Sequence, residues 1–169
     1  GTCASSPCGL ISDTGNITIN TITKGTGYAY YLRNPVIANG TAASGKGNVT
    51  ISATGRYGAI YGDGGTYGYV LANGNIDLIG YGGFVSATYG IYLAGSGPTL
   101  AETAGGSLRS ASGNITLSAF GYDKGLFGTT AAVIVALSQN VVVQGAALST
   151  NSAGTQTADT NTAILSTYS

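Results

Sequence analysis

Side chains that could carry out acid–base or nucleophilic chemistry are scarce in this sequence. None of its 169 residues is histidine, so the usual general base is absent and serine or cysteine triads of the common type are excluded. Six residues are Asp or Glu, and only Asp77 lies in a pentad that recurs along the chain, where the matching residues are Thr50 and Thr116. A catalytic pair of carboxylates on neighbouring strands is therefore not expected. The sequence predicts no catalytic residues and no cofactor.

Two other groups of residues could bind a metal ion, but each has too few ligands. The turn Gly-Asp-Gly-Gly at 62–65 is faintly similar to a calcium-binding turn, yet Asp63 is one carboxylate where calcium prefers about six to eight oxygens. A plain tight turn is favoured. Cys3 and Cys8 are only two ligands, and the chain has no histidine to complete a zinc site. They are candidates for a local disulfide, which would indicate an oxidising, extracytoplasmic compartment, and two free thiols are the alternative.

Tyrosine is the most prominent residue type that could contact a ligand. The chain has 12, and most of them form clusters: Tyr28, Tyr30 and Tyr31; Tyr57, Tyr61, Tyr67 and Tyr69; Tyr81, Tyr89 and Tyr92. An aromatic column on the side of a β-protein could stack on sugars or pack against a neighbouring subunit. The alternative, which we favour, is that these rings fill corners and cover the sides of the fold.

Asparagine-linked glycosylation is a candidate modification. Four sequons occur, at Asn16, Asn39, Asn48 and Asn114. Three of them coincide with a recurring Gly-Asn corner, which explains them without a glycan. Asn39 lies in an expected loop and is therefore the candidate glycosylation site.

The elements that would position these residues follow a repeat. The pentad Gly-Asn-Ile-Thr-Ile at 15–19 recurs with small changes at 47–51, 74–78 and 113–117, and more weakly at 139–143. Each copy alternates apolar and polar residues as a half-buried strand does, and Gly-Asn favours a turn before it. Second strands are expected at 28–32, 57–61, 87–93, 131–137 and 163–165, with an extra short strand at 67–71. Pro35 is expected to block pairing, and 95–112 and 149–161 are expected to be loops.

Stacking of the repeats would align equivalent side chains into ladders. The two inward ladders would be Ile17, Val49, Ile76, Ile115 and Val141, and Ile19, Ile51, Leu78, Leu117 and Val143. Burial of each is worth roughly 1.5–3 kcal/mol, so these residues should dominate the core, and Ile22 is also expected to face inward. The outward ladder would be Thr18, Thr50, Asp77, Thr116 and Val142. An asparagine column that hydrogen-bonds from coil to coil would contain Asn16, Asn48, Asn75, Asn114 and Asn140.

The spacing of the repeats sets the expected architecture. The five asparagines are 32, 27, 39 and 26 residues apart, which is too irregular for short hexapeptide or nonapeptide coils. The pattern favours an all-β, large-rung parallel solenoid of about five irregular coils. We expect a single solenoid domain at 13–169, preceded by an N-terminal segment at 1–12 that carries Cys3 and Cys8. An antiparallel sandwich is the alternative, but it does not explain why one pentad recurs.

Composition excludes some classes of partner. The chain has six basic and six acidic residues, so its formal net charge is zero, which argues against nucleic acid as a partner. No apolar run approaches the roughly 20 residues that a membrane-spanning helix requires. We expect no membrane span.

The repeated Gly-Asn-(Ile/Val)-Thr-(Ile/Leu) pentads, each followed by a Gly/Tyr-rich segment and a second apolar strand, suggest a family. Over about residues 13–167 the chain resembles the filamentous-haemagglutinin-like repeats of bacterial surface adhesins. The resemblance implies a secreted, right-handed parallel β-helix that projects from a cell surface as a fibre. Extracellular or cell-surface localisation is therefore expected.

The functional expectation is a non-catalytic structural subunit or segment of such a fibre. The end coils of a solenoid expose unpaired backbone edges, and we see no capping helix or charge-rich end in the sequence. We therefore expect a homo-polymer that grows by end-to-end stacking. One alternative is an adhesin module that binds host or matrix glycans through its Tyr-rich sides. A second alternative is a β-helix enzyme that acts on polysaccharides.

Overall fold

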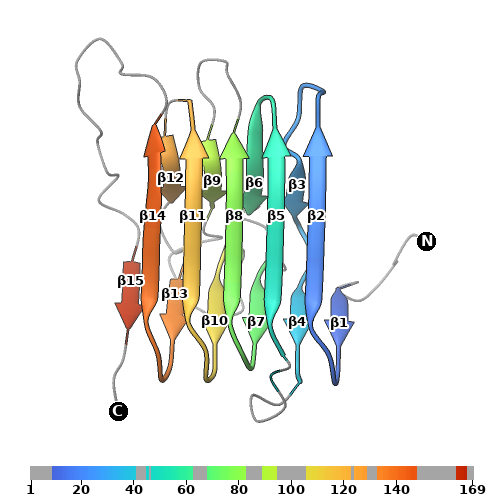
Figure 1. The fold of residues 1–169 in the computed structure, drawn as a ribbon, viewed down its shortest axis with the longest axis vertical. Coiled ribbons are helices and arrows are strands. Elements are labelled where there is room, and N and C mark those ends of the chain that lie inside the picture. Colours follow the sequence, from blue (N-terminus) through green and yellow to red (C-terminus); the bar gives the residue numbers. More distant parts are fainter. Residues whose placement is uncertain are drawn as a thin grey trace.

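The fold consists of three parallel β-sheets and is all-β in the part of the chain that the structure describes. The computed structural model describes residues 9–40, 45, 47–62, 68–82, 89–94, 106–122, 124–128, 133–147 and 163–166. The five-stranded sheet, called sheet B, spans the height of the molecule; the four-stranded sheet C lies behind its upper half and the six-stranded sheet A behind its lower half (Figure 1). The described residues include no helical segment that could cross a lipid bilayer.

The strands are short, and successive strands along the chain belong to different sheets. Sheet A contains β1 (Leu10–Ser12), β4 (Val36–Ala38), β7 (Val70–Ala72), β10 (Leu108–Ser110), β13 (Val133–Ala136) and β15 (Ala163–Ser166). Sheet B contains β2 (Ile17–Thr23), β5 (Val49–Gly55), β8 (Ile76–Gly82), β11 (Ile115–Gly121) and β14 (Val141–Ala147). Sheet C contains β3 (Tyr30–Leu32), β6 (Gly58–Gly62), β9 (Tyr89–Leu93) and β12 (Lys124–Gly128).

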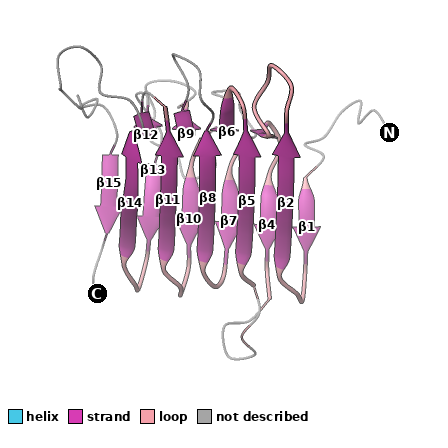
Figure 2. Cartoon of the chain, turned by 45° about the horizontal axis from the view of Figure 1, so that its top comes forward, coloured by secondary structure: helices cyan, strands magenta, loops and turns pink. Residues whose placement is uncertain are grey.

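The chain passes from sheet A to sheet B to sheet C and then returns to sheet A beside its own earlier strand (Figure 2). Pairing is parallel throughout the described strands, as between β2 and β5, β4 and β7, or β6 and β9. An antiparallel sandwich is therefore wrong. The arrangement is consistent with a parallel β-helix.

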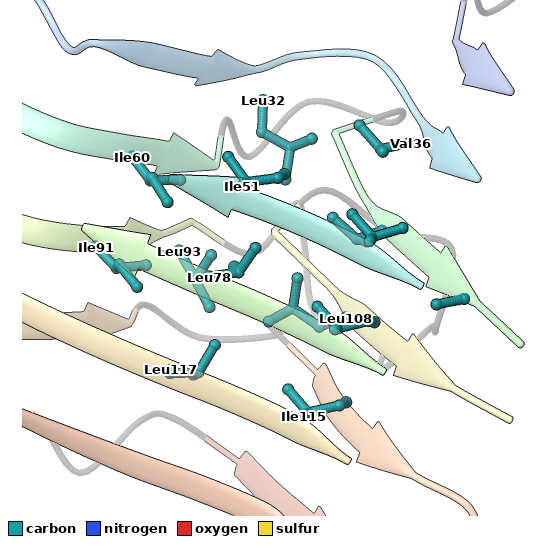
Figure 3. Packing of buried hydrophobic residues seen from close by; sticks show 14 of the residues in the cluster. Leu32, Val36, Ile51, Ile60, Leu78, Ile91, Leu93, Leu108, Ile115 and Leu117 are labelled. Carbon is teal, nitrogen blue, oxygen red and sulfur yellow. The ribbon is translucent and has the colours of Figure 1, made fainter. Parts of the chain in front are cut away.

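The recurring pentads form sheet B in the register that their spacing predicted. Ile17 pairs with Val49, Val49 with Ile76, and Ile76 with Ile115. Side chains alternate between the two faces of each strand, so every second residue of β5 and β8 is buried. These buried aliphatic side chains meet those of sheets A and C in one core (Figure 3).

The end strands differ from the predicted core. Ile19 and Val141 are half-buried and pack against the core, but Val143 is 43% exposed although it lies in register with buried Leu117. The reason is that β14 is the last strand of sheet B, so a side chain there lacks a neighbour on one side. Ile22 was expected to face inward, and it is 80% exposed because it alternates with the inward positions of β2.

Each of the first four coils has three described strands, one in each sheet, whereas the sequence predicted two strands for most coils. The predicted second strands at 28–32, 57–61 and 87–93 overlap β3, β6 and β9 of sheet C. The segment assigned to an extra strand at 67–71 includes the start of β7, a regular member of sheet A. Strand β10 lies within the expected loop at 95–112, and β12 lies before the run at 131–137, whose described part forms β13. Pro35 does not stop pairing, because its carbonyl oxygen accepts a hydrogen bond from Leu10 N (2.9 Å).

The N-terminal boundary also differs from the expectation. Residues 10–12, which were assigned to the segment before the solenoid, form β1 and pair with Val36–Ala38 of β4. Cys3 and Cys8 lie outside the described residues, as do Asp63 and the tract at 149–161.

Sheets B and C approach so closely at one end of their strands that only glycine fits. A Cβ atom added to Gly80 of β8 would lie 2.4 Å from the carbonyl oxygen of Gly90 in β9. Real Cβ contacts are not this short, so this position needs a residue without a side chain. A Cβ atom added to Gly55, Gly82 or Gly121 of sheet B would likewise lie too close to a backbone carbonyl group of sheet C.

Candidate functional site

The asparagine column hydrogen-bonds from one coil to the next. Each side-chain oxygen accepts from the backbone N–H of the following asparagine: Asn16 Oδ1 from Asn48 N (3.0 Å), Asn48 Oδ1 from Asn75 N (2.7 Å), Asn75 Oδ1 from Asn114 N (2.8 Å) and Asn114 Oδ1 from Asn140 N (3.1 Å). The ladder predicted from the sequence exists, but its bonds run from side chain to backbone rather than from amide to amide. It therefore extends the β-ladder around the corner before each strand of sheet B.

The backbone pattern of sheet B repeats without change from strand to strand. Each first strand residue donates its N–H to the asparagine carbonyl of the next coil: Ile17 to Asn48 (2.9 Å), Val49 to Asn75 (2.8 Å), Ile76 to Asn114 (2.9 Å) and Ile115 to Asn140 (3.0 Å). Within the described residues, β2 and β14 each have only one neighbouring strand. The open edges of β2 and β14 are therefore complementary: each carries the backbone groups with which the other would pair if the hydrogen-bond pattern continued.

Apolar side chains are exposed beside both open edges. At the N-terminal end these are Leu10 and Ile11 of β1 and Ile22 of β2, and at the C-terminal end they are Val142 and Val143 of β14. Unpaired strand edges with exposed apolar side chains are templates for pairing with another chain. These edge strands, β1 and β2 at one end and β14 at the other, are the candidate interaction site.

An aromatic column runs along the outer face of sheet C. Tyr31, Tyr61, Tyr92 and Phe127 occupy one register row, with ring centroids 4.7 Å apart for the first two pairs and 5.1 Å for the third. The rings of Tyr61 and Tyr92 are nearly parallel, at an interplanar angle of 7°. The rings therefore stack on one another at about the spacing of the strands that carry them.

Cations cover both ends of this column. The Arg33 guanidinium lies 4.5 Å from the centroid of the Tyr31 ring, and Lys124 Nζ lies 4.0 Å from that of Phe127. Both are cation–π contacts. Ring faces within the column are covered by other rings, so the column presents mainly ring edges to solvent. Sugars stack on ring faces, so this geometry supports packing between coils more than glycan binding.

Three tyrosines of this region, Tyr28, Tyr30 and Tyr92, have a raised pKa. Burial, followed by the electrostatic effect of Tyr89 and Tyr61, raises the pKa of Tyr28 to about 12. Burial also raises the pKa of Tyr30, and burial together with Tyr89 raises that of Tyr92. The raised pKa favours the uncharged phenol of Tyr28, Tyr30 and Tyr92, and Arg33 and Lys124 place a positive charge at either end of the column.

The polar residues singled out in the sequence do not form a reactive cluster in the described part of the chain. Asp77 lies between Thr50 and Thr116 in register, and Asp13 Oδ1 accepts a long hydrogen bond from Asn39 Nδ2 (3.5 Å). Among the described residues no group of three or more Cys, Asp or Glu side chains could hold a metal ion. Asn39 is exposed, and its amide side chain contacts Asp13.

Sequence reasoning found the tyrosines of the column but missed Phe127, Arg33 and Lys124. Phe127 lies between Leu126 and Gly128 in a segment that was not expected to be a strand, and only its register opposite Tyr92 places it in the column. A second stacked pair, Tyr81 and Phe120, lies on the outer face of sheet B with centroids 5.1 Å apart.

Comparisons with known proteins give no further identification. No family model matches the sequence, and no curated protein or solved structure is significantly similar to the chain. Functional inference therefore depends on the geometry described above.

Proposed function

We propose that this protein is a non-catalytic structural subunit or segment of an extracellular surface fibre. In this proposal the three sheets form a right-handed parallel β-solenoid of about five irregular coils, the hand that parallel crossovers nearly always take. Copies join head to tail, with β14 of one copy beside β2 of the next. The contact is heterologous and does not close on itself, so it generates a filament.

The observation that carries the proposal is the unchanged pattern of hydrogen bonds across sheet B. Four successive first residues donate to the asparagine carbonyl one coil further on. The next donor in this series is Val141 N, and the equivalent acceptor on a second copy is the Asn16 carbonyl. The internal pair β11–β14 aligns seven residues, and a β14–β2 pair between copies offers the same seven positions.

The resemblance of the pentads to those of surface adhesins supports an extracellular location. It also keeps adhesion as the second candidate function. The exposed Tyr81 and Tyr57 rings are better placed to contact a glycan than the column on sheet C, whose ring faces are covered. A polysaccharide-acting enzyme receives the least support, because Asp77 has threonine neighbours in its ladder.

The test is concentration-dependent assembly of the full chain and its loss when the β2 edge is blocked. Ile17 N donates to the carbonyl of Asn48, the residue before β5, so the N–H groups of the odd-numbered residues of β2 point toward β5 and those of Thr18 and Asn20 point to the open edge. Proline at both positions removes two edge donors and is tolerated on an edge strand whose N–H faces solvent. At about 1 kcal/mol for each hydrogen bond, the critical concentration should rise roughly 30-fold.

The matched control replaces Thr18 and Asn20 with valine and alanine, which change the side chains but keep both N–H groups. Light scattering and negative-stain images should show filaments of the natural chain and of this control, and short or absent filaments of the T18P/N20P variant. Monomers of the natural chain at all concentrations would contradict the proposal. Equal assembly of the proline variant would contradict the assigned edge.

A further inference from the structure

The two ends of the fold do not match in the described residues. Sheet A has six strands and sheet B has five. At the N-terminal end, β1 and β2 are consecutive strands of one coil and both are edge strands. At the C-terminal end, β13 and β14 belong to one coil, but β15 pairs with the far side of β13 and lies one strand beyond β14 (Figure 1). Sheet A therefore projects one strand further than sheet B.

The projecting strand has the same register and nearly the same sequence as the first strand. In sheet A the successive pairs align Leu10 with Val36, Val70, Leu108, Ile134 and Ile164. Residues 164–166 of β15 are Ile-Leu-Ser, and residues 10–12 of β1 are Leu-Ile-Ser in the same three rows. Either strand could therefore occupy the position beside β13.

This equivalence creates a conflict when a second copy arrives, an argument that rests on the proposed end-to-end assembly. If β2 of the new copy pairs with β14, then β1 of the same copy falls on the place that β15 occupies. If β15 stays, β1 can pair only beyond it, and sheet B is left with a gap one strand wide, about 4.8 Å. Both sheets cannot continue while β15 remains in place.

We propose that β15 is an exchangeable edge strand that occupies the binding position for β1 of a second copy. Its release from β13 lets β1 of the new copy take over sheet A while β2 extends sheet B. The exchange loses the four aligned residue pairs of β13 and β15. It gains three pairs between β13 and β1 of the new copy, if β1 pairs as it does with β4, and seven pairs between β14 and β2 of the new copy in sheet B. The assembled state therefore contains more strand pairing, and β15 slows or limits its formation.

The direction of the hydrogen bonds in β1 provides a precise way to block the exchange. Leu10 N donates to the Pro35 carbonyl, and the Ser12 carbonyl accepts from Asn39 N, so residues 10 and 12 face β4 in the same chain. The N–H of Ile11 points to the opposite side, toward the open edge. Ile11→Pro therefore removes the edge donor and leaves the internal bonds of β1 in place.

The experiment compares assembly kinetics of the full natural chain, an I164P/L165P variant and the same variant carrying Ile11→Pro. Two adjacent prolines remove the N–H groups of β15 on both of its sides. We expect the I164P/L165P chain to assemble after a severalfold shorter lag and at a severalfold lower critical concentration. Adding Ile11→Pro should reverse the gain. Removal of residues 163–169 provides a second variant with the same expectation, and far-UV circular dichroism checks that each chain is folded.

The outcomes separate this inference from the proposed function. If the natural chain assembles, T18P/N20P blocks it and loss of β15 pairing brings no acceleration, end-to-end stacking stands and the exchange of β15 is wrong. If neither the natural chain nor the β15 variants assemble, both proposals are wrong. Assembly of the natural chain that becomes faster once β15 is disrupted would support both.

Discussion

Replacement of Tyr61 by alanine should destabilise the protein through the loss of ring contacts. Tyr61 lies between Tyr31 and Tyr92 in the aromatic column and also contacts Tyr28, with all three centroids 4.7 Å away. Each aromatic pair is worth about 0.5–1.5 kcal/mol beyond the area it buries. Three pairs give about 1.5–4.5 kcal/mol, and because Tyr61 is only half-buried we expect about 2–3 kcal/mol.

Equilibrium unfolding in urea, followed by circular dichroism, would measure this loss. The matched control is Tyr57→Ala, because Tyr57 is 37% exposed and makes no ring contact among the described residues. Its free energy of unfolding should change by about 0.5 kcal/mol or less. A double-mutant cycle of Tyr61 with Tyr92 isolates the stacked pair and should give a coupling energy of about 1 kcal/mol.

Two results would refute this reasoning. A coupling energy near zero between Tyr61 and Tyr92 would mean that the observed stacking adds nothing to burial. Equal effects of the Tyr61 and Tyr57 substitutions would mean that the column does not hold the coils together. Loss of glycan binding at unchanged stability would instead assign the column to recognition.

Three further predictions concern the core, the contact between sheets and alkaline pH. Ile76→Ala should lower the free energy of unfolding in urea by about 2–5 kcal/mol because this side chain is fully buried, whereas Ile22→Ala should cost about 0.5 kcal/mol or less. Gly80→Ala should lower the free energy of unfolding by about 1–3 kcal/mol, because the added methyl group would collide with backbone. Gly27→Ala should lower it less, because a Cβ atom there meets no atom within 4 Å, and thermal unfolding would compare the two variants. Folding raises the pKa of Tyr28 from 10.0 to about 12. The contribution of the uncharged Tyr28 side chain to stability should therefore be complete below pH 10 and be lost as the pH rises through 12. Urea unfolding midpoints across this pH range, with Tyr28→Phe as the control, would check this.

Sheet B could be predicted from the sequence because its strands are long enough to show their period. The strand from Val49 to Gly55 alternates between the two faces over seven residues, and the turn before it has the same Gly-Asn sequence in four of the five copies. The pentad spacing then fixes the register. The prediction failed at the ends of the sheet, as at Val143, because burial there depends on a neighbouring strand that a repeat pattern does not reveal.

Sheets A and C could be predicted only in part: β3, β6, β9, β13 and β15 overlap predicted strands, whereas β4, β10 and β12 were missed. All of their described strands have three to five residues, which is too few to display alternation clearly. Val36–Ala38 follows a proline, and Leu108–Ser110 contains an arginine and lies after a long Gly/Ala/Ser-rich stretch. These segments become strands because the coil before each one provides a pairing edge. Tertiary context therefore decides their structure.

The candidate site was only partly visible in the sequence. The asparagine column and the open edges followed from the repeat, but the bonding pattern of Asn48, from its side-chain oxygen to the backbone of Asn75, required coordinates. The tyrosines were evident, whereas the covering of Tyr31 by Arg33 depends on local geometry that spacing does not determine.

The hydrogen bonds between coils lie along the direction in which the coils stack, and this determines how the protein would respond to tension. A pull on the two ends of the chain loads the hydrogen bonds of an end coil first, so a coil peels away strand by strand from the end at which the force acts. Successive asparagines are 32, 27, 39 and 26 residues apart, so each detached coil would release a different length of chain, about 85–140 Å at full extension. Because the loops differ in length from coil to coil, the molecule would lengthen in unequal steps under load.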